Sequence, residues 1–278
     1  MKTKIILEMG CNHQGSMEIA KEMIDQAAKL NVWAVKFQKR TLSLIPVEEA
    51  EKPRSLKNSF GETYYEHRAA LEFNYSQLRE LKNYSEDKGL KFIVTAFDIP
   101  ALVHLSDFCD YVKLPSQKFS KDKYFNKWEE LQPRPKMIVS CGMHTIDKIL
   151  KSEWVSNSEI FMHCNSIYPV KNPYDLNFDV IRLLSIERKG IGVGYSSHDL
   201  NIGVIANAVL CGAEYVERHF TLNKNMKGSD HSTVSSTYED IKNLQGLLLN
   251  FETMLGNKER LSKDEQVIAE RYEAWKKE

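Results

Sequence analysis

Charged side chains interrupt four short apolar segments of this sequence, each near the C-terminal end of its segment: Glu8, Lys36, Lys113 and Glu217. Alternate residues of a strand share a face, so Lys36 is expected to point with Gln38 and Glu217 with His219. Burying an unpaired charge is costly, and such a cluster therefore requires mutual pairing, a ligand or a metal ion. A structural ion-pair network and a catalytic centre both satisfy this requirement, and the pattern favours the catalytic centre.

Two histidines stand at the ends of neighbouring apolar segments. His198 follows one segment in the sequence GYSSHD, and His219 ends the next segment. Ends of adjacent strands lie about 4.8 Å apart, so the two imidazoles can bind one ion and leave positions open for water and substrate. The sequence therefore indicates an exchangeable catalytic ion rather than a structural zinc, with a simple hydrogen-bonding role for each histidine as the alternative.

Hydroxyl side chains flank the same segment ends: Thr95, Ser116, Ser166 and Ser196. Lysine is a common point charge for phosphate, and hydroxyls donate hydrogen bonds around it. Together with Lys36 and Lys113, these residues predict a site for a small polyanion. Taken singly, each hydroxyl is more typical of a turn or helix cap.

The chain alternates between apolar segments and amphipathic stretches. Eight segments are predicted as strands: Lys4–Met9, Trp33–Gln38, Lys91–Ala96, Asp110–Leu114, Lys136–Cys141, Ser158–Cys164, Gly190–Tyr195 and Glu214–His219. Helical periodicity lies between them, as in Met17–Leu30, Tyr75–Lys88, Thr145–Lys151, Phe178–Arg188 and Gly203–Cys211. Eight such units predict an α/β fold, the (β/α)8 TIM barrel, whose chemistry takes place at the carboxyl ends of its strands. No GxGxxG follows the first strand, which argues against a dinucleotide-binding fold.

The length of 278 residues suits a single barrel domain spanning residues 1–278. A long insertion around residues 39–72 shows little regular pattern and contains Tyr64, Tyr65, His67 and Arg68. Long loops of this kind are usually functional or disordered. Residues 238–277 predict two charged C-terminal helices, Tyr238–Leu255 and Ser262–Lys277.

The bulk composition excludes several classes of partner. Lys+Arg and Asp+Glu are both 38, which gives a formal net charge of zero and no sign of a nucleic-acid or anionic-membrane binder. No apolar run approaches the ~20 residues of a membrane span, and no signal peptide is recognisable. Five widely spaced cysteines are typical of a reducing compartment, so we expect a cytoplasmic protein with free thiols.

Several motifs, in order along the chain from about Lys4 to Glu265, resemble those of the sialic acid (N-acetylneuraminate) synthase family. The matching segments are Glu8–Ser16, Ala34–Gln38, Lys113–Ser116, His163–Pro169, Gly194–His198, Val216–Thr221 and Gly228–His231. The resemblance implies a barrel enzyme that condenses phosphoenolpyruvate with an amino-sugar aldose, releasing phosphate and a 2-keto-3-deoxy sugar acid. It also implies a homodimer.

The resemblance assigns roles to residues at matching positions. It implies a divalent ion on His198 and His219, with manganese expected and magnesium or cobalt as alternatives. The expected phosphoenolpyruvate ligands are Lys36, Thr95, Lys113, Ser116, Ser166, Tyr168 and Ser196. The expected acceptor ligands are Gln38 and Asp230, to which we add Lys118, Tyr168 and Arg68. The expected catalytic groups are Glu217, as a general base, together with Lys113, Lys36 and Glu8.

The sequence departs from the family pattern on the acceptor side. We expect the chain to lack the family's C-terminal antifreeze-like domain, which lends an arginine to the partner's acceptor site. Lys118 replaces a sugar-binding carboxylate, and Ser166 replaces an asparagine. A lysine only donates hydrogen bonds, so we predict that the acceptor differs from free N-acetylmannosamine and carries a carboxylate, a phosphate or extra carbonyl groups.

Two other functions are compatible with the sequence. One is an aldolase of the same fold that forms a Schiff base on Lys113, which requires a lowered lysine pKa. The other is a non-catalytic sugar-binding barrel. Retention of both histidines and of Glu217 argues against the non-catalytic alternative.

Overall fold

The computed structural model describes residues 2–276 except for 56, 188–189, 229–232 and 256–260. Eight parallel strands form a closed barrel: β1 (Lys4–Gly10), β2 (Ala34–Lys39), β3 (Lys91–Ala96), β4 (Tyr111–Leu114), β5 (Lys136–Ser140), β6 (Ile160–Cys164), β7 (Gly192–Ser197) and β8 (Tyr215–Phe220). Pairing of β1 with β8 closes the barrel, and a short β9 (Ser235–Ser236) pairs with the end of β8. The predicted (β/α)8 fold is confirmed.

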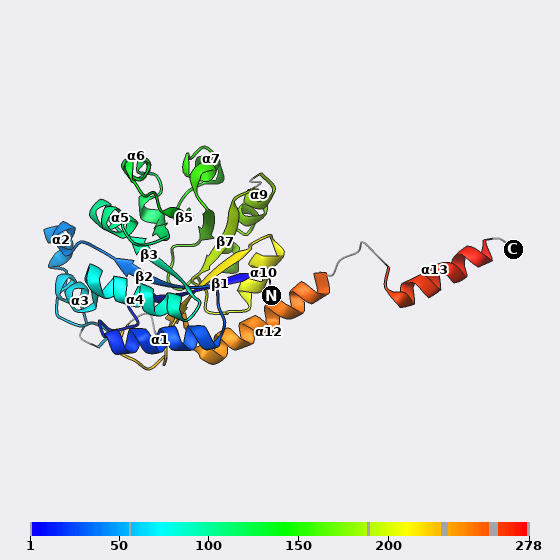
Figure 1. The fold of residues 1–278 in the computed structure, drawn as a ribbon, viewed down its shortest axis with the longest axis horizontal. Helices are drawn as coiled ribbons and strands as arrows, with labels where there is room; N and C mark the ends of the chain where they lie inside the picture. The colour runs from blue at the N-terminus through cyan, green and yellow to red at the C-terminus, as the bar shows by residue number, and fades with distance from the viewer. Residues whose placement is uncertain (1, 56, 188–189, 229–232, 256–260, 277–278) are drawn as a thin grey trace.

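Helices surround the barrel and connect its strands, as Figure 1 shows. They are α1 (Met17–Lys29), α4 (Tyr75–Asp87), α5 (Ile99–Ser106), α6 (Asp122–Glu130), α7 (Ile146–Leu150), α8 (Trp154–Asn157), α9 (Asp179–Glu187), α10 (Val204–Leu210) and α12 (Tyr238–Leu255). In α1, the Ser16 side chain caps the first turn by accepting from the Ile19 amide, and Met23 and Ile24 are buried against the strands.

The inside of the barrel changes from apolar to polar along the strands. A lower layer consists of apolar side chains: Ile6, Ala34, Ile93, Ile138, Ile160, Met162 and Tyr215. Two residues beyond Ile6, Ala34, Ile93, Ile138, Met162 and Tyr215, on the same face of six of the strands, the side chains are Glu8, Lys36, Thr95, Ser140, Cys164 and Glu217. The period of two that is typical of strands therefore collects the polar side chains at the carboxyl end of the barrel.

The insertion between β2 and β3 contains more regular structure than the sequence indicated. It forms η1 (Leu42–Leu44), α2 (Val47–Ala50) and α3 (Tyr64–Leu71). Thr63 and Glu66 form a reciprocal capping box at the start of α3. The expectation of little regular structure is wrong for this segment, and the T-x-x-E signature at residues 63–66 was the signal that identifies the helix.

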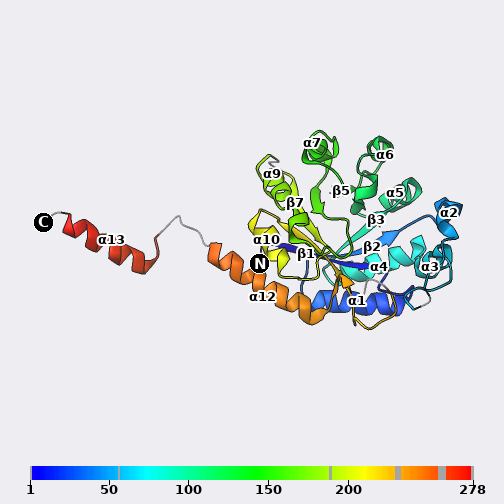
Figure 2. The ribbon, with the colours of Figure 1, turned by 180° about the vertical axis from the view of Figure 1, so that it is seen from behind.

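The C-terminal helices differ in their packing. In α12, Ile241, Leu244 and Leu248 are buried in the main core, and Glu252 accepts hydrogen bonds from the Thr3 amide and hydroxyl. Helix α13 (Lys263–Trp275) extends away from the barrel in both views (Figures 1 and 2). In the described ranges, no helix combines the length and apolar character needed to cross a membrane.

Candidate active site

A cavity of about 180 Å³ opens at the carboxyl ends of the barrel strands. Of the residues assigned to the site from the sequence, the following line it: Glu8, Lys36, Gln38, Thr95, Lys113, Ser116, Ser166, Tyr168, Ser196, His198, Glu217 and His219. These side chains come from strands far apart in the sequence, and barrel closure brings them together. The location is that of active sites in (β/α)8 enzymes.

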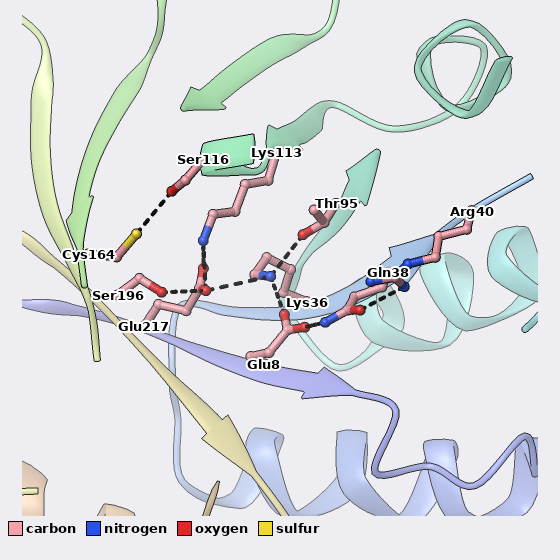
Figure 3. A network of polar contacts seen from close by, with 10 residues as sticks. All are labelled: Glu8, Lys36, Gln38, Arg40, Thr95, Lys113, Ser116, Cys164, Ser196 and Glu217. Carbon is pink, nitrogen blue, oxygen red and sulfur yellow. Dashed lines mark hydrogen bonds and ion pairs between the residues drawn. The ribbon is translucent and has the colours of Figure 1, made fainter. Parts of the chain in front are cut away.

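Buried ion pairs cross the floor of the cavity (Figure 3). The Lys113 ammonium donates to both Glu217 carboxylate oxygens, at 2.7 and 2.8 Å. Lys36 pairs with Glu8, lies 3.5 Å from Glu217 and donates to the Thr95 hydroxyl at 2.9 Å. The four charges sum to zero, which is the condition under which such a cluster can stay buried.

The network sets the protonation of its members. Burial favours the neutral form of Glu217, but Lys113 and Lys36 outweigh it and lower the pKa of this carboxyl to about 2. Burial also opposes the charged form of Lys36, and Glu217 and Glu8 overcome it and raise the pKa of Lys36. For Lys113, burial together with repulsion from Lys36 outweighs Glu217 and lowers the pKa. The two lysines of the cavity are therefore electrostatically distinct.

Hydroxyl groups lie beside these charges. The Ser196 hydroxyl donates to Glu217 at 3.0 Å, and Ser116 Oγ lies 3.1 Å from the sulfur of Cys164. Ser166 also lines the cavity. The predicted grouping of hydroxyls around Lys36 and Lys113 is therefore present in the structure.

The two histidines lie next to each other at the cavity wall. Their ring centroids are 5.8 Å apart, and the Tyr168 ring covers His198 at a centroid distance of 3.9 Å. Nδ1 of His198 lies 2.6 Å from the Asn165 carbonyl oxygen. A carbonyl only accepts, so Nδ1 carries the proton and the lone pair of His198 is on Nε2. Burial, followed by the charge of His219, lowers the pKa of His198 to about 3, which keeps the ring neutral.

Two predicted acceptor residues, Arg68 and Lys118, are not among the described residues that line the cavity. A third, Asp230, lies outside the described residues. Arg68, on α3, donates to Tyr64 and to the Cys11 sulfur, both at 3.0 Å. Lys118 stands over the Tyr124 ring at 5.9 Å, and Gln117 lines the cavity in its place. Successive side chains of the tight η2 turn (Ser116–Lys118) point in different directions, so Ser116 and Gln117 line the cavity and Lys118 does not. Its role in binding the acceptor stays a prediction.

The sequence interpretation also missed residues near the cavity. Arg40 follows β2 directly, donates to Gln38 Oε1 at 2.9 Å and stacks on Phe97 with 3.4 Å from Cζ to the ring centroid. The predicted strand ended at Gln38, so the alternation of residues within strands was not applied to Arg40. The signal that was available is that Arg40 lies two residues after Gln38.

Comparison with known proteins identifies the family. A model described as the NeuB family matches residues 23–260. The chain belongs to the NeuB family. The resemblance noted from the sequence motifs is thereby confirmed.

Individual relatives agree with this assignment. The N-acetylneuraminate-9-phosphate synthase of Homo sapiens is 36% identical over 234 residues, which are 82% of this chain and 64% of that protein. The N,N'-diacetyllegionaminic acid synthase of Legionella pneumophila is 30% identical, over 95% of this chain and 76% of that one. The crystal structure of a sialic acid synthetase from Leptospira borgpetersenii superposes with a TM-score of 0.84 at 26% identity, covering 100% of this chain and 94% of that chain. The chain thus spans less than two thirds of the length of its human relative.

Proposed function

We propose that this protein condenses phosphoenolpyruvate with an amino-sugar aldose to give a nonulosonate-like 2-keto-3-deoxy sugar acid and inorganic phosphate. The observation that carries the proposal is the cavity in which two lysines, two glutamates and two histidines converge. The names of the human and Legionella relatives, both synthases of sugar acids of this kind, support it.

Phosphoenolpyruvate binds, in this proposal, against Lys113 and Lys36. Both ammonium groups are buried and already oriented by carboxylates. The phosphate and carboxylate of the ligand join them as counter-charges, with hydrogen bonds from the surrounding hydroxyls and Tyr168: Thr95, Ser116, Ser166, Tyr168 and Ser196. A cavity with fixed cations offers this polyanion electrostatic stabilisation that water does not.

His198 and His219 would hold a divalent ion, with manganese expected. The residues fit such an ion because both rings line the cavity side by side, and the Asn165 carbonyl fixes the His198 tautomer that leaves Nε2 able to coordinate. Among the described residues, no group of three His, Cys, Asp or Glu side chains is arranged as a complete metal site, so water and substrate would supply the other ligands. A bound ion would act as a Lewis acid toward the acceptor aldehyde.

The reaction joins C3 of phosphoenolpyruvate to the aldehyde carbon as the C=O π bond of the aldehyde opens, and the former aldehyde oxygen takes up a proton and becomes a hydroxyl. Water then adds at C2 with loss of one proton, and the C2–O bond to phosphorus-bound oxygen breaks to release phosphate and form the C2 ketone. Glu217 accepts the proton of this water as a general base, since it is ionised and Ser196 and Lys113 hold its oxygens in place. Glu8 keeps Lys36 charged and orients Gln38, whose Nε2 donates to it at 2.6 Å.

The acceptor sugar lies, in this proposal, between Gln38 and Tyr168, with Asp230 as a further ligand. We propose that it is not free N-acetylmannosamine. The support for this lies in the cations near the cavity, namely Arg40, Arg68 and Lys118. Arg40 contacts Gln38 directly, whereas Arg68 contacts Cys11 and Lys118 lies over the Tyr124 ring.

The test is a phosphate-release assay with phosphoenolpyruvate, manganese and a panel of aldoses. Phosphate release that depends on both the aldose and the metal is expected. If no aldose stimulates release, the protein does not have this activity, and the non-catalytic alternative gains support.

A Schiff-base aldolase is the second candidate, favoured by one observation: burial lowers the pKa of Lys113, as a nucleophilic lysine requires. The bidentate contact with Glu217 argues against it, because that contact holds Lys113 as an ammonium. Borohydride treatment in the presence of a 2-ketoacid would reveal a covalent adduct on Lys113 if the aldolase mechanism operates. The condensation mechanism predicts no adduct.

A further inference from the structure

Arg218 and Asp199 are buried charged residues on the outer face of strands β7 and β8, behind the two histidines of the cavity. Asp199 directly follows His198, and Arg218 directly precedes His219. Because Glu217 and His219 line the cavity, Arg218 between them points to the opposite face of β8. Neither residue is among the described residues that line the cavity, and they are only 3% and 4% exposed.

A hydroxyl group joins the two charges. Ser197 Oγ donates to Asp199 Oδ2 at 2.9 Å and accepts from Arg218 Nη1 at 3.1 Å. The phenol of Tyr195 donates to the same carboxylate oxygen at 2.6 Å. A buried charge is costly unless it is compensated and hydrogen-bonded, and this network meets both conditions. The proposed reaction uses none of these four side chains, so the reaction by itself does not explain why charges are buried here.

The ladder between β7 and β8 ends where the histidines begin. The last residues that the two strands pair are Ser197 and Arg218, and His198 lies just beyond β7. Arg218 continues the connection, because its Nη1 donates to the Asp199 carbonyl oxygen at 2.6 Å. A guanidinium on β8 therefore holds the backbone on the far side of His198.

The same guanidinium holds the backbone that lies beside His219. Its Nε donates to Ser236 Oγ at 3.0 Å. Ser236 belongs to β9, whose other residue, Ser235, pairs with His219. A planar guanidinium carries donors in several fixed directions, so Arg218 contacts a segment next to each histidine at once. An ammonium on a flexible stem does not reproduce this fork.

We propose that Arg218, together with Asp199, is a positioning residue that fixes the separation and orientation of His198 and His219, so that both rings hold one divalent ion. This inference rests on the proposed function and extends it to residues on the outer face of the barrel. The Asn165 carbonyl sets the tautomer of His198. The network behind the strands adds what that contact does not supply, which is a connection between the segments that carry the two histidines.

The test measures manganese binding by metal-depleted protein without substrates, through loss of the electron paramagnetic resonance signal of free Mn²⁺. Arg218→Lys keeps the charge but loses the guanidinium fork, and it should raise Kd for manganese about tenfold or more, the scale for removing a group that supports a metal ligand. Asp199→Asn keeps the size of the side chain but removes the counter-charge of Arg218, and it should also raise Kd about tenfold.

A pair of tyrosine variants separates positioning from general stability. Tyr195→Phe removes the phenol that donates to Asp199, and Tyr84→Phe removes a phenol that donates to Asp25 at 2.9 Å between helices α4 and α1. Both variants lose one hydrogen bond to a carboxylate, so similar small decreases in Tm are expected. Only Tyr195→Phe should raise Kd for manganese, by about tenfold.

A spectroscopic measurement at saturating metal reports the geometry of the ligands directly. The visible absorption of the Co²⁺-loaded protein depends on how the imidazoles are arranged around the ion. The spectrum should change in Arg218→Lys and in Asp199→Asn, and it should match that of the wild type in Tyr84→Phe. A decrease in stability alone does not produce this difference.

Wild-type manganese affinity in Arg218→Lys, Asp199→Asn and Tyr195→Phe would overturn the inference and leave the condensation reaction intact. An equal loss of affinity in Tyr84→Phe would assign the effect to stability and would also overturn it. If Arg218→Lys does not fold, Asp199→Asn and Tyr195→Phe decide the question in the same way. A wild type that binds no manganese would instead contradict the metal in the proposed function, and the inference with it.

Discussion

The two buried lysines of the cavity show how neighbouring charges set the pKa of a side chain. Lys36 faces two carboxylates and has a raised pKa, whereas Lys113 faces one carboxylate and the charge of Lys36 and has a lowered pKa. Both are fully buried in the same layer of the barrel. The same residue type thus gives one lysine whose charged form is favoured and one that loses its proton more easily.

Replacing Lys113 with methionine should weaken phosphoenolpyruvate binding, because the variant keeps most of the side-chain shape but removes a buried cation. The loss should be about 2–5 kcal/mol, the scale for truncating one partner of a buried charge pair. Isothermal calorimetry with phosphoenolpyruvate measures it. Lys91→Met is the control, since Lys91 is exposed at the start of β3. An unchanged affinity in Lys113→Met would show that this lysine only balances Glu217.

Replacing His219 with alanine should abolish stoichiometric manganese binding, because it removes one of the two proposed protein ligands. Metal content after dialysis, measured by atomic emission, gives a readout independent of turnover. His104→Ala, on the exposed side of α5, should retain the metal of the wild type. A full metal complement in His219→Ala would rule out the assignment.

Strand parity explains which residues could be predicted from the sequence. Glu8, Lys36, Lys113 and Glu217 lie within strands, so the period of two fixed their common face. Arg40 and Lys118 lie beyond strand ends, where the direction of a side chain depends on loop geometry and tight turns. The sequence therefore identified the buried charged residues of the cavity but missed Arg40, and it selected Lys118 without being able to fix the direction of its side chain.

At the level of elements, the end of β1 is a point of strain. The register of β1 against β2 shifts between Glu8 and Gly10, and Gly10 has a φ of +53°. A side chain at this φ is disfavoured, and a Cβ would also lie 3.5 Å from His219 Nδ1. This irregularity turns the chain so that Cys11 contacts Arg68 while Glu8 remains in the barrel.

Gly10→Ala should therefore destabilise the protein by about 1 kcal/mol and reduce turnover. Thermal unfolding measures the first effect and the phosphate assay the second. Gly246→Ala is a matched control in which the change in stability should have the opposite sign. Gly246 lies within α12, and a Cβ there meets no atom within 4 Å. Alanine there should stabilise the protein by up to about 1 kcal/mol. If Gly10→Ala were as stable as Gly246→Ala, backbone strain at the end of β1 would be excluded.

The capping box of α3 gives another element-level test. Thr63→Ala removes the side chain that accepts from the Glu66 amide, and it should cost about 1 kcal/mol of stability. Because α3 carries Arg68, a predicted acceptor ligand, the variant should also raise KM for the acceptor aldose in the phosphate-release assay. An unchanged KM would show that Arg68 is positioned by Tyr64 and Cys11 alone.

At the scale of the whole molecule, the alternation of short apolar segments with amphipathic helical stretches predicted the barrel. The predicted strand limits agree with the structure to within about two residues, as in Lys91–Ala96, since apolar runs end where the backbone leaves the barrel. The helices of the 39–72 insertion were missed because their apolar faces are small, and only His67 and Leu71 are buried in α3. The single-domain organisation, the homodimer and the cytoplasmic location stay predictions.

The central claim is that the cavity joins phosphoenolpyruvate to an aldose with release of phosphate. The most direct measurement is the stoichiometry of inorganic phosphate and condensed sugar acid, by colorimetric assay and mass spectrometry, with phosphoenolpyruvate, manganese and each aldose of the panel. The account predicts one phosphate for each sugar acid, whose mass equals acceptor plus phosphoenolpyruvate plus water minus phosphoric acid, and loss of both products in Glu217→Gln. Phosphate release without a sugar acid, or a sugar acid formed from pyruvate without phosphate release, would contradict it.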